Sequence, residues 1–259
     1  MDIQKGDYVT RTSYNNDTVF KVINIKGNVC YLKGAEVRLY ADSEINDLVK
    51  CEKPDEIKEE TSDDSRKSTV SADTEYFFLP PKIIHIDGDS EFLGKCLKYY
   101  KKLGIYAIGK KIKEEDVPNQ VKQLLENYKP GILIITGHDA FYKKKGDIHS
   151  LDNYKNSKNF IKAVQIARNI EPSHEKLVII AGACQSNYEE LIKAGANYAS
   201  SPKRVNIHAL DPAIIASTVA LTERNKEINL KEMLKKTKYG SDGMGGIMGN
   251  GLMYVGYPR

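Results

Sequence analysis

The feature that most constrains the fold of this 259-residue chain is the alternation of short apolar runs with amphipathic segments after residue 77. Runs rich in Val and Ile and bounded by Gly or polar residues are typical of buried parallel strands. We predict strands at 82–87, 105–109, 131–136, 177–182 and 198–201, and helices that include 117–128 and 156–169. This order predicts an α/β fold with a doubly wound, mostly parallel sheet, right-handed connections and helices on both faces.

Residues 1–49 have a different pattern, which predicts a small β module. Strand-like runs at 18–25 and 28–32 flank Lys26-Gly27, a hairpin signal. A further run at 36–40 is predicted to close an SH3-like β-barrel. Modules of this kind more often bind or position a partner than catalyse a reaction.

An acidic segment separates the two patterns. Residues 50–75 carry nine acidic and five basic side chains, a balance of −4 in a chain of net charge +4. Few apolar side chains and many Ser, Thr, Asp and Glu are typical of a flexible linker. We therefore predict three segments, a β module at 1–49, a linker at 50–76 and an α/β domain at 77–259. In the C-terminal tail, the Asn-Gly pair within 247–253 predicts a hairpin.

Two of the predicted strands end in a reactive side chain. His138 follows the strand at 131–136, and Cys184 follows the strand at 177–182. Because the carboxyl ends of parallel strands meet at one edge of a sheet, we expect the imidazole and the thiol to lie side by side. A cysteine attacks a carbonyl as its thiolate, and a neighbouring imidazole accepts the thiol proton and later protonates the leaving amine. Either residue alone would be read as structural, but the pair predicts a catalytic dyad.

The residues around the predicted dyad resemble the caspase signature. Gly182-Ala183-Cys184-Gln185-Ser186 is similar to Q-A-C-[RQG]-G, whose His lies about 50 residues upstream, and here 46 residues separate His138 from Cys184. Caspase-type enzymes carry Gly after the His, whereas here Gly137 precedes it and Asp139 follows it. We expect Gly137, Asp139 and Gln185 to support an oxyanion hole formed by the N–H groups of Asp139 and Cys184. Orientation of the imidazole by the Asp139 carboxylate is an open alternative.

Asp87 and Asp89 end the first predicted strand of the α/β domain. A carboxylate pair at a strand end could bind a metal, orient a substrate amine or recognise a basic side chain. An N-cap of the following helix is the structural alternative for this pair. We assign Asp87 and Asp89 to a substrate pocket and predict no metal site.

Several classes of protein are disfavoured by what the sequence lacks. No run approaches the length of a membrane span, and the N-terminus has no apolar signal region, so we expect a soluble cytoplasmic protein without a membrane partner. The four cysteines have no C-x-x-C spacing, which argues against a zinc site and a disulfide scaffold. No basic helix or aromatic stacking platform indicates nucleic acid. We predict no cofactor, and the sequence leaves the oligomeric state open.

Six motifs together resemble the YabG family of sporulation-specific proteases: Gly6-Asp7-Tyr8-Val9, Val37-Arg38-Leu39-Tyr40-Ala41-Asp42, His85-Ile86-Asp87-Gly88-Asp89, Ile135-Thr136-Gly137-His138-Asp139-Ala140, Ala181-Gly182-Ala183-Cys184-Gln185-Ser186, and residues 199–212. The resemblance covers nearly the whole chain. It implies a peptidase of the mother cell that trims spore-coat and related proteins during maturation, with cleavage at basic sites. It also implies a location in the mother-cell cytoplasm, near the forming coat.

The sequence thus predicts a caspase-like cysteine endopeptidase in which Cys184 attacks the scissile carbonyl and His138 moves the proton. Flexible linkers are preferred places for nicking, so Arg66-Lys67 is a predicted self-processing site. Two alternatives stay open. The first is a non-enzymatic receiver-like domain, based on Asp87 at a strand end and on Lys203 after the last parallel strand. The second is a catalytically silent scaffold for coat assembly.

Overall fold

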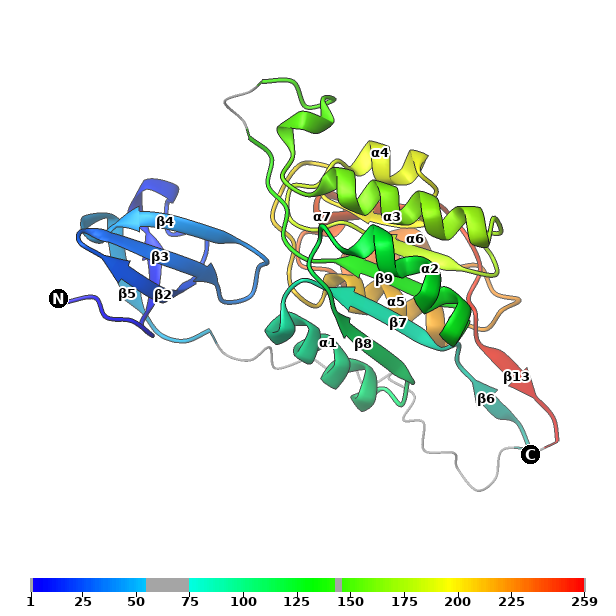
Figure 1. Cartoon of the computed structure of the whole chain (residues 1–259). Coiled ribbons are helices and arrows are strands. Elements are labelled where there is room, and N and C mark those ends of the chain that lie inside the picture. Colours follow the sequence, from blue (N-terminus) through cyan, green and yellow to red (C-terminus); the bar gives the residue numbers. More distant parts are fainter. Residues whose placement is uncertain (1, 55–74, 143–145, 259) are drawn as a thin grey trace. The chain divides into compact units, whose positions relative to one another are not determined.

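The computed structural model describes residues 2–54, 75–142 and 146–258 (Figure 1). The chain divides into two compact units, Met1–Ser65 and Arg66–Arg259. Most of the predicted linker, including Arg66-Lys67, lies outside the described residues, so the three-segment division and the self-processing site stay predictions.

The first unit is an antiparallel sheet of the order β4-β3-β2-β1-β5. Its strands are β1 (Tyr8–Arg11), β2 (Phe20–Lys26), β3 (Val29–Gly34), β4 (Tyr40–Glu44) and β5 (Leu48–Cys51). The hairpin at Lys26-Gly27 is confirmed, because Lys26 pairs with Val29. The strand predicted at 36–40 is wrong. Gly34 N–H donates to Leu39 O and Leu39 N–H donates to Val37 O, which makes this stretch a compact turn, and the strand that pairs with β3 begins at Tyr40. The SH3-like assignment stays a prediction.

The second unit is built on a mostly parallel sheet, as predicted. Its strands are β7 (Ile83–Asp87), β8 (Ala107–Lys111), β9 (Ile132–Thr136), β10 (Val178–Ala181), β11 (Tyr198–Ser200) and β12 (Met244–Gly246). They lie in the order β12-β11-β10-β9-β7-β8, and only β12 at the edge runs antiparallel to its neighbour among these described strands. Each of the five predicted strands overlaps an observed one.

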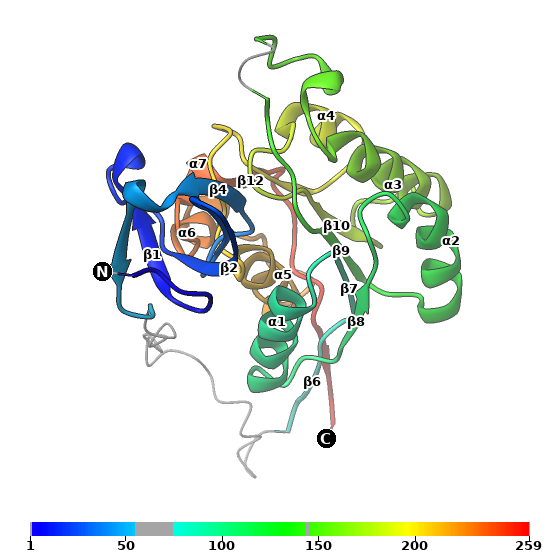
Figure 2. The same ribbon diagram turned by 60° about the vertical axis from the view of Figure 1, so that its left-hand side comes forward.

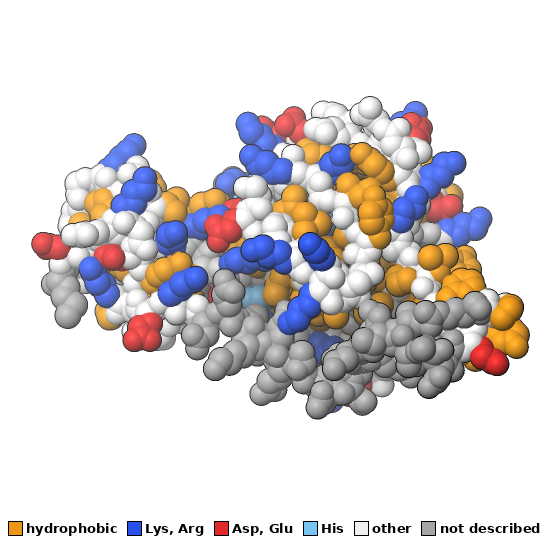
Figure 3. All heavy atoms as spheres, turned by 90° about the horizontal axis from the view of Figure 1, so that it is seen from below, with side chains coloured by type: hydrophobic (Ala, Val, Ile, Leu, Met, Phe, Trp, Pro, Cys, Tyr) orange, Lys and Arg blue, Asp and Glu red, His pale blue; other side chains and the backbone are white. Residues whose placement is uncertain are grey.

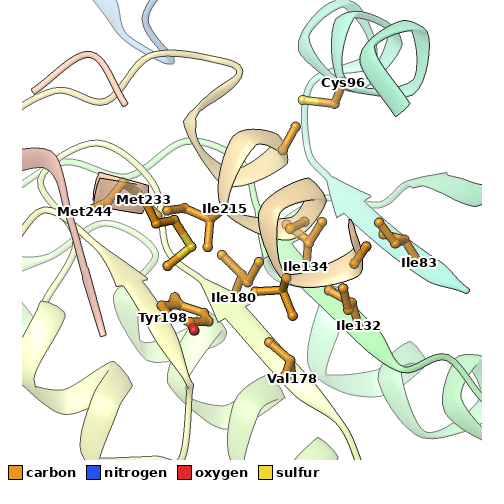
Figure 4. Close-up of a cluster of buried hydrophobic side chains, with 14 of the residues drawn as sticks. Ile83, Cys96, Ile132, Ile134, Val178, Ile180, Tyr198, Ile215, Met233 and Met244 are labelled. Carbon is orange, nitrogen blue, oxygen red and sulfur yellow. The ribbon is translucent and has the colours of Figure 1, made fainter. Parts of the chain in front are cut away.

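Helices cover both faces of this sheet (Figure 2). One face packs on α1 (Ser90–Lys102), α5 (Asp211–Leu221) and α6 (Leu230–Lys235). The other face packs on α2 (Val117–Tyr128), α3 (Ser157–Ile170) and α4 (Tyr188–Lys193). Because successive strand residues point to opposite faces, Ile134 and Ile180 enter the first core while Leu133 and Ile179 enter the second. Figure 4 shows the first core, in which strand side chains face Ile215 and Met233.

The C-terminal tail differs from the sequence prediction. The hairpin predicted within 247–253 is wrong, since this segment instead lies against residues 223–228 through bonds such as Ile228 N–H to Gly249 O. A short helix, α7 (Gly240–Gly243), precedes β12, and the last strand, β13 (Tyr254–Gly256), pairs with β6 (Phe77–Leu79) in a separate two-stranded ribbon. The predicted hairpin is therefore replaced by contacts of residues 247–253 with residues 223–228, and the strand that follows pairs with β6, which lies far away along the chain.

The surface of the described residues mixes side chains of different kinds. The ribbon of β6 and β13 exposes most of its apolar side chains, and apolar side chains gather at the corresponding end of the face in Figure 3. On the same face, Lys and Arg side chains lie dispersed among apolar and uncharged ones (Figure 3). None of the helices described here has both the length and the apolar character needed to cross a bilayer.

Candidate functional site

The strand register brings the chain segments that lead to His138 and Cys184 to neighbouring points at one edge of the sheet. Strands β9 and β10 are parallel neighbours, and Ile135 pairs with Ala181. His138 and Cys184 each lie three positions beyond this pair. Neighbouring strands are about 4.8 Å apart, so the two residues start from adjacent points on one edge of the sheet. The sequence pattern predicts a thiol and its base at these two positions, and a contact between the Cys184 Sγ and the His138 ring stays a prediction.

The register adds Asp89 to the same level on the opposite side of His138. Strands β7 and β9 are parallel, and Asp87 pairs with Thr136. Asp89 and His138 each lie two positions beyond that pair. The Nε2 atom of His138 lies 3.3 Å from Oδ2 of Asp89, and the imidazole retains 14% exposure. A carboxylate thus contacts the candidate base directly, and it comes from the turn after β7 rather than from the neighbouring residue Asp139.

Asp89 also begins helix α1. Its Oδ1 accepts hydrogen bonds from Glu91 N–H at 2.9 Å and Phe92 N–H at 3.2 Å, so the N-cap alternative is confirmed. The Phe92 ring lies 6.2 Å from the His138 ring, centroid to centroid. The start of α1 therefore supplies both a carboxylate and an aromatic ring to His138.

Asp87 is the last residue of β7, two positions before Asp89, and is fully buried. Its Oδ1 accepts the N–H of Asp89 at 2.8 Å, and its Oδ2 lies 3.9 Å from Nε2 of His85. The other ring nitrogen of His85 lies 2.9 Å from the Tyr100 hydroxyl. Asp87 therefore contributes to a buried polar chain that supports the Asp89 turn, and a substrate would have to displace protein groups to reach its carboxylate.

Glu114 is a site residue that sequence reasoning missed. It lies between β8 and α2, and its Oε1 accepts the backbone N–H of His138 at 2.7 Å. The carboxylate lies over Gly88 and Gly137, where a Cβ atom would come within 2.3 Å and 2.4 Å of Oε1. Gly137 thus leaves room for Glu114 at the end of β9. Glu114 is half-buried, whereas Asp87, Asp89 and Asp139 are buried, so Glu114 is the most exposed of these four acidic residues.

Cys184 lies in a tight turn after β10 and has no exposed surface. Ile207 donates its backbone N–H to the Cys184 Sγ at 3.3 Å, and the same thiol lies 3.7 Å from Ile207 O. The turn is unusual, because Gly182 has a φ of +103° and Gln185 a φ of +57°. A segment that follows β11 therefore covers the thiol in this structure.

Gln185 links the two loops on either side of Cys184. Its Nε2 donates to Asn206 Oδ1 at 3.2 Å, while its Oε1 accepts the N–H of Phe141 at 3.2 Å. Its backbone N–H is shared between Ser201 Oγ at 2.9 Å and Val205 O at 3.1 Å. The predicted supporting role of Gln185 is compatible with these contacts, which fasten the loop after β9 to the loop after β11.

Asp139 is buried, and its carboxylate ties together three segments. Oδ2 accepts bonds from Ser157 Oγ at 2.5 Å and Ser186 Oγ at 2.8 Å, and Oδ1 accepts the N–H groups of Ala140 and Asn156. All the described hydrogen bonds of Asp139 use the carboxylate, and none involves the imidazole of His138. The contacts favour the loop-shaping role over orientation of His138. Burial raises the pKa of the Asp139 carboxyl above its usual value, although the hydrogen bonds act in the opposite direction.

Asp139→Asn is expected to gain stability relative to the wild type as the pH rises. A raised folded-state pKa means that protonation of Asp139 favours folding, and this contribution is complete below the unfolded pKa of about 3.9. It is lost as the pH rises through the folded-state pKa. Asparagine carries no charge and avoids this loss. Urea unfolding should therefore show that the unfolding free energy of Asp139→Asn, relative to that of the wild type, is larger at about pH 7 than at about pH 4. A smaller relative value at about pH 7 would mean that bonds to the ionised carboxylate outweigh the effect of burial.

No arrangement of three or more His, Cys, Asp or Glu side chains suited to a metal ion occurs within the part of the chain that the structure describes. The titratable side chains described at this edge are the imidazole of His138, the thiol of Cys184 and the carboxylates of Asp87, Asp89, Glu114 and Asp139.

Comparison with known proteins gives two consistent findings. A family model described as YabG peptidase U57 matches residues 4–258. A protein of Bacillus subtilis (strain 168) named sporulation-specific protease YabG is 42% identical over 286 residues, and the alignment covers 100% of this chain and 99% of that protein. The similarity therefore extends over both compact units and is not confined to the edge that carries His138 and Cys184.

Proposed function

The chain belongs to the YabG peptidase family and is therefore a protease, and on that premise we propose that it is a cysteine endopeptidase with Cys184 as nucleophile and His138 as general base and acid. A hydrolase of peptide bonds acts on protein substrates. The family assignment favours this function over the receiver-like domain and the silent scaffold. The caspase-like character of the site forms part of the proposal.

The proposed reaction has two steps. His138 accepts the Cys184 proton, the thiolate attacks the scissile carbonyl carbon, and the C–N bond breaks as the imidazolium protonates the leaving amine. Water then attacks the thioester carbonyl while His138 accepts one of its protons. The C–S bond breaks, the carboxylic acid leaves, and the proton on His138 returns to the thiolate. The balance needs one water molecule for each peptide bond.

The observation that carries the proposal is the common register of the two residues. Cys184 and His138 each stand three positions beyond the paired residues Ala181 and Ile135 on neighbouring parallel strands. Functional groups of open α/β sheets gather at this edge. A buried structural thiol needs no such partner, whereas a nucleophile needs a base within reach.

Access to the thiol requires movement of the segment that covers it. The thiol is completely buried and accepts the Ile207 N–H, so a substrate carbonyl meets Sγ only after this segment shifts. Displacement of that contact would also free the Ile207 N–H for the backbone of a bound peptide. In this proposal substrate binding and exposure of the nucleophile are one event.

The oxyanion hole in this proposal consists of the N–H groups of Cys184 and Asp139. The backbone N–H of His138 is already bonded to Glu114, which leaves the next N–H along the chain as the better candidate. The Asp139 carboxylate fixes the loop that carries this N–H, and Gln185 fixes the turn that carries the other. Preorganised donors of this kind stabilise the negative oxygen of the tetrahedral intermediate.

The proposed preference for Arg or Lys is supported by Glu114, which is partly exposed at this edge of the sheet. Asp87 and Asp89, which the sequence assigns to the substrate pocket, are buried and bonded to protein groups, so they add negative charge behind the site without contacting the substrate. A guanidinium that enters such a site pairs well with a carboxylate, and Glu114 is the carboxylate that it would meet first. We further propose, from the family resemblance, that the substrates are spore-coat and related proteins in the mother-cell cytoplasm, near the forming coat.

Covalent labelling tests the proposal. A peptidyl acyloxymethyl ketone with Arg next to the reactive group should alkylate Cys184, and mass spectrometry should find the adduct on the peptide that contains this residue. The same probe with Asp in place of Arg should react at least about 10-fold more slowly, because a mismatched charge weakens binding. Labelling of Cys30, Cys51 or Cys96 instead would contradict the assigned nucleophile. Equal rates with both probes would contradict only the basic preference.

A further inference from the structure

We propose that Asp89 is the positioning residue for His138, holding the imidazole through Nε2 so that Nδ1 carries the lone pair that accepts the Cys184 proton. The inference rests on the proposed function, because it assigns a role within that dyad. Its direct basis is the 3.3 Å contact between Asp89 Oδ2 and His138 Nε2. A carboxylate at this distance favours the tautomer with the proton on Nε2.

The two oxygens of Asp89 have separate partners, which fixes the carboxylate in space. Oδ1 is held by the N–H groups of Glu91 and Phe92 at the start of α1, and Oδ2 faces the imidazole. Helix α1 has 13 residues and is packed in the core through residues such as Phe92 and Tyr100. These bonds hold the Asp89 side chain against the start of a packed helix, so its carboxylate has a fixed direction toward His138.

The backbone on both sides of this contact is also fixed. The N–H of Asp89 donates to Oδ1 of the buried Asp87 at 2.8 Å. On the other side, the N–H of His138 donates to Glu114 at 2.7 Å, and its carbonyl oxygen accepts Asn156 Nδ2 at 2.8 Å. With both main chains held, the remaining freedom of His138 lies in its side-chain torsions, and the Asp89 contact restrains the ring itself.

The contact matters for the chemical step more than for substrate binding. When His138 accepts the thiol proton, its ring becomes positively charged, and a nearby carboxylate stabilises that charge. The same contact prevents a ring flip that would exchange the two nitrogens. Since neither effect requires a substrate contact by Asp89, we expect kcat to depend on this residue while KM changes little.

Asp89→Asn is the decisive variant, because Asn caps helices as well as Asp does and keeps an oxygen for the α1 N–H groups. It replaces the charged oxygen that faces Nε2 by an amide. We expect kcat to fall roughly 10- to 100-fold with the protein still folded and with KM changed less than about 3-fold. Asp89→Ser also retains a capping oxygen and should show the same loss.

Asn229→Ala is the matched control for loss of a helix cap. Asn229 caps α6 through Glu232 N–H and lies outside the site, so its removal costs helix stability alone. Its kcat should equal that of the wild type. A full kcat in folded Asp89→Asn and Asp89→Ser would overturn the role of Asp89.

Nitrogen-15 NMR of the His138 ring gives a readout that a purely structural role would not move. In Cys184→Ala protein, which cannot turn over, the neutral ring should carry its proton on Nε2, and addition of Asp89→Asn should abolish this preference. A proton on Nδ1 with Asp89 in place would also overturn the inference. Undiminished cleavage by His138→Ala would instead contradict the proposed function itself, so the two failures are distinguishable.

Discussion

Replacement of Cys184 by alanine is expected to abolish peptide-bond cleavage and to lower kcat/KM by about 10⁴-fold or more. The reason is chemical, since alanine offers no atom that can form the acyl-enzyme. Cleavage of a co-expressed coat protein, with mass spectrometry of the products, measures the loss. The termini of the products formed by the wild type also report the residues that the enzyme prefers.

The alanine variant should remain folded. Its missing sulfur leaves a small gap in the core and deprives the Ile207 N–H of its acceptor, at a combined cost of about 1 to 3 kcal/mol. Circular dichroism should therefore show the wild-type spectrum. Undiminished cleavage by a folded Cys184→Ala would mean that the thiol is structural and that the proposed nucleophile is wrong.

Cys96 offers a matched control for the loss of a buried thiol. It lies in the same hydrophobic cluster as Cys184, is equally buried, and directs its Sγ toward a backbone oxygen, Ala209 O, at 3.4 Å. Cys96→Ala removes the same kind of sulfur atom from the same core at a residue that is not part of the predicted dyad. It should lose a similar amount of stability and keep full activity.

The sheet of the second unit was predictable because each central strand is buried on both faces. A strand in that setting is apolar at most positions, as at Ile132, Leu133, Ile134 and Ile135, and such runs are visible without structural information. The same logic predicts His138 and Cys184 at one edge, and the parallel pairing of β9 with β10 agrees with the strand order that this prediction needs. The predictions were wrong where burial does not determine the sequence pattern. The residues of the compact turn at 34–39 have the composition of a strand, and the Asn-Gly pair in the tail is typical of a hairpin turn.

The partners of His138 could not be predicted because they depend on three-dimensional proximity between segments far apart in the chain. Asp89 is 49 residues away, and Glu114 is 24 residues away. Glu114 lies in a run of charged residues before α2, and such a run is typical of the solvent-exposed beginning of a helix. The two glycines beneath its carboxylate, Gly88 and Gly137, are the only trace of the contact in the sequence, and their meaning emerges once the strands are placed side by side.

The second large effect is expected at Gly182, two residues before the thiol. Its φ of +103° is rarely adopted by residues with a side chain, and a Cβ would lie 2.4 Å from Ser200 Oγ and 2.8 Å from Leu191 Cδ1. Backbone strain and overpacking together should make Gly182→Ala less stable by roughly 2 to 5 kcal/mol. Thermal unfolding should show a fall in Tm of roughly 5 to 15 °C, and the displaced turn should lower activity even below that temperature.

Gly94→Ala separates this effect from the general consequence of adding a methyl group. Gly94 lies inside α1, its φ is ordinary, and nothing lies within 4 Å of the position that a Cβ would take. Alanine should therefore stabilise the protein there by about 0.5 to 1 kcal/mol, through its better helix propensity and the reduced freedom of the unfolded chain. The same chemical change thus has opposite signs at the two positions. An equal stability of Gly182→Ala and Gly94→Ala would contradict this prediction. It would mean that the turn before Cys184 tolerates a side chain, so that contacts other than the conformation of Gly182 fix the position of the thiol.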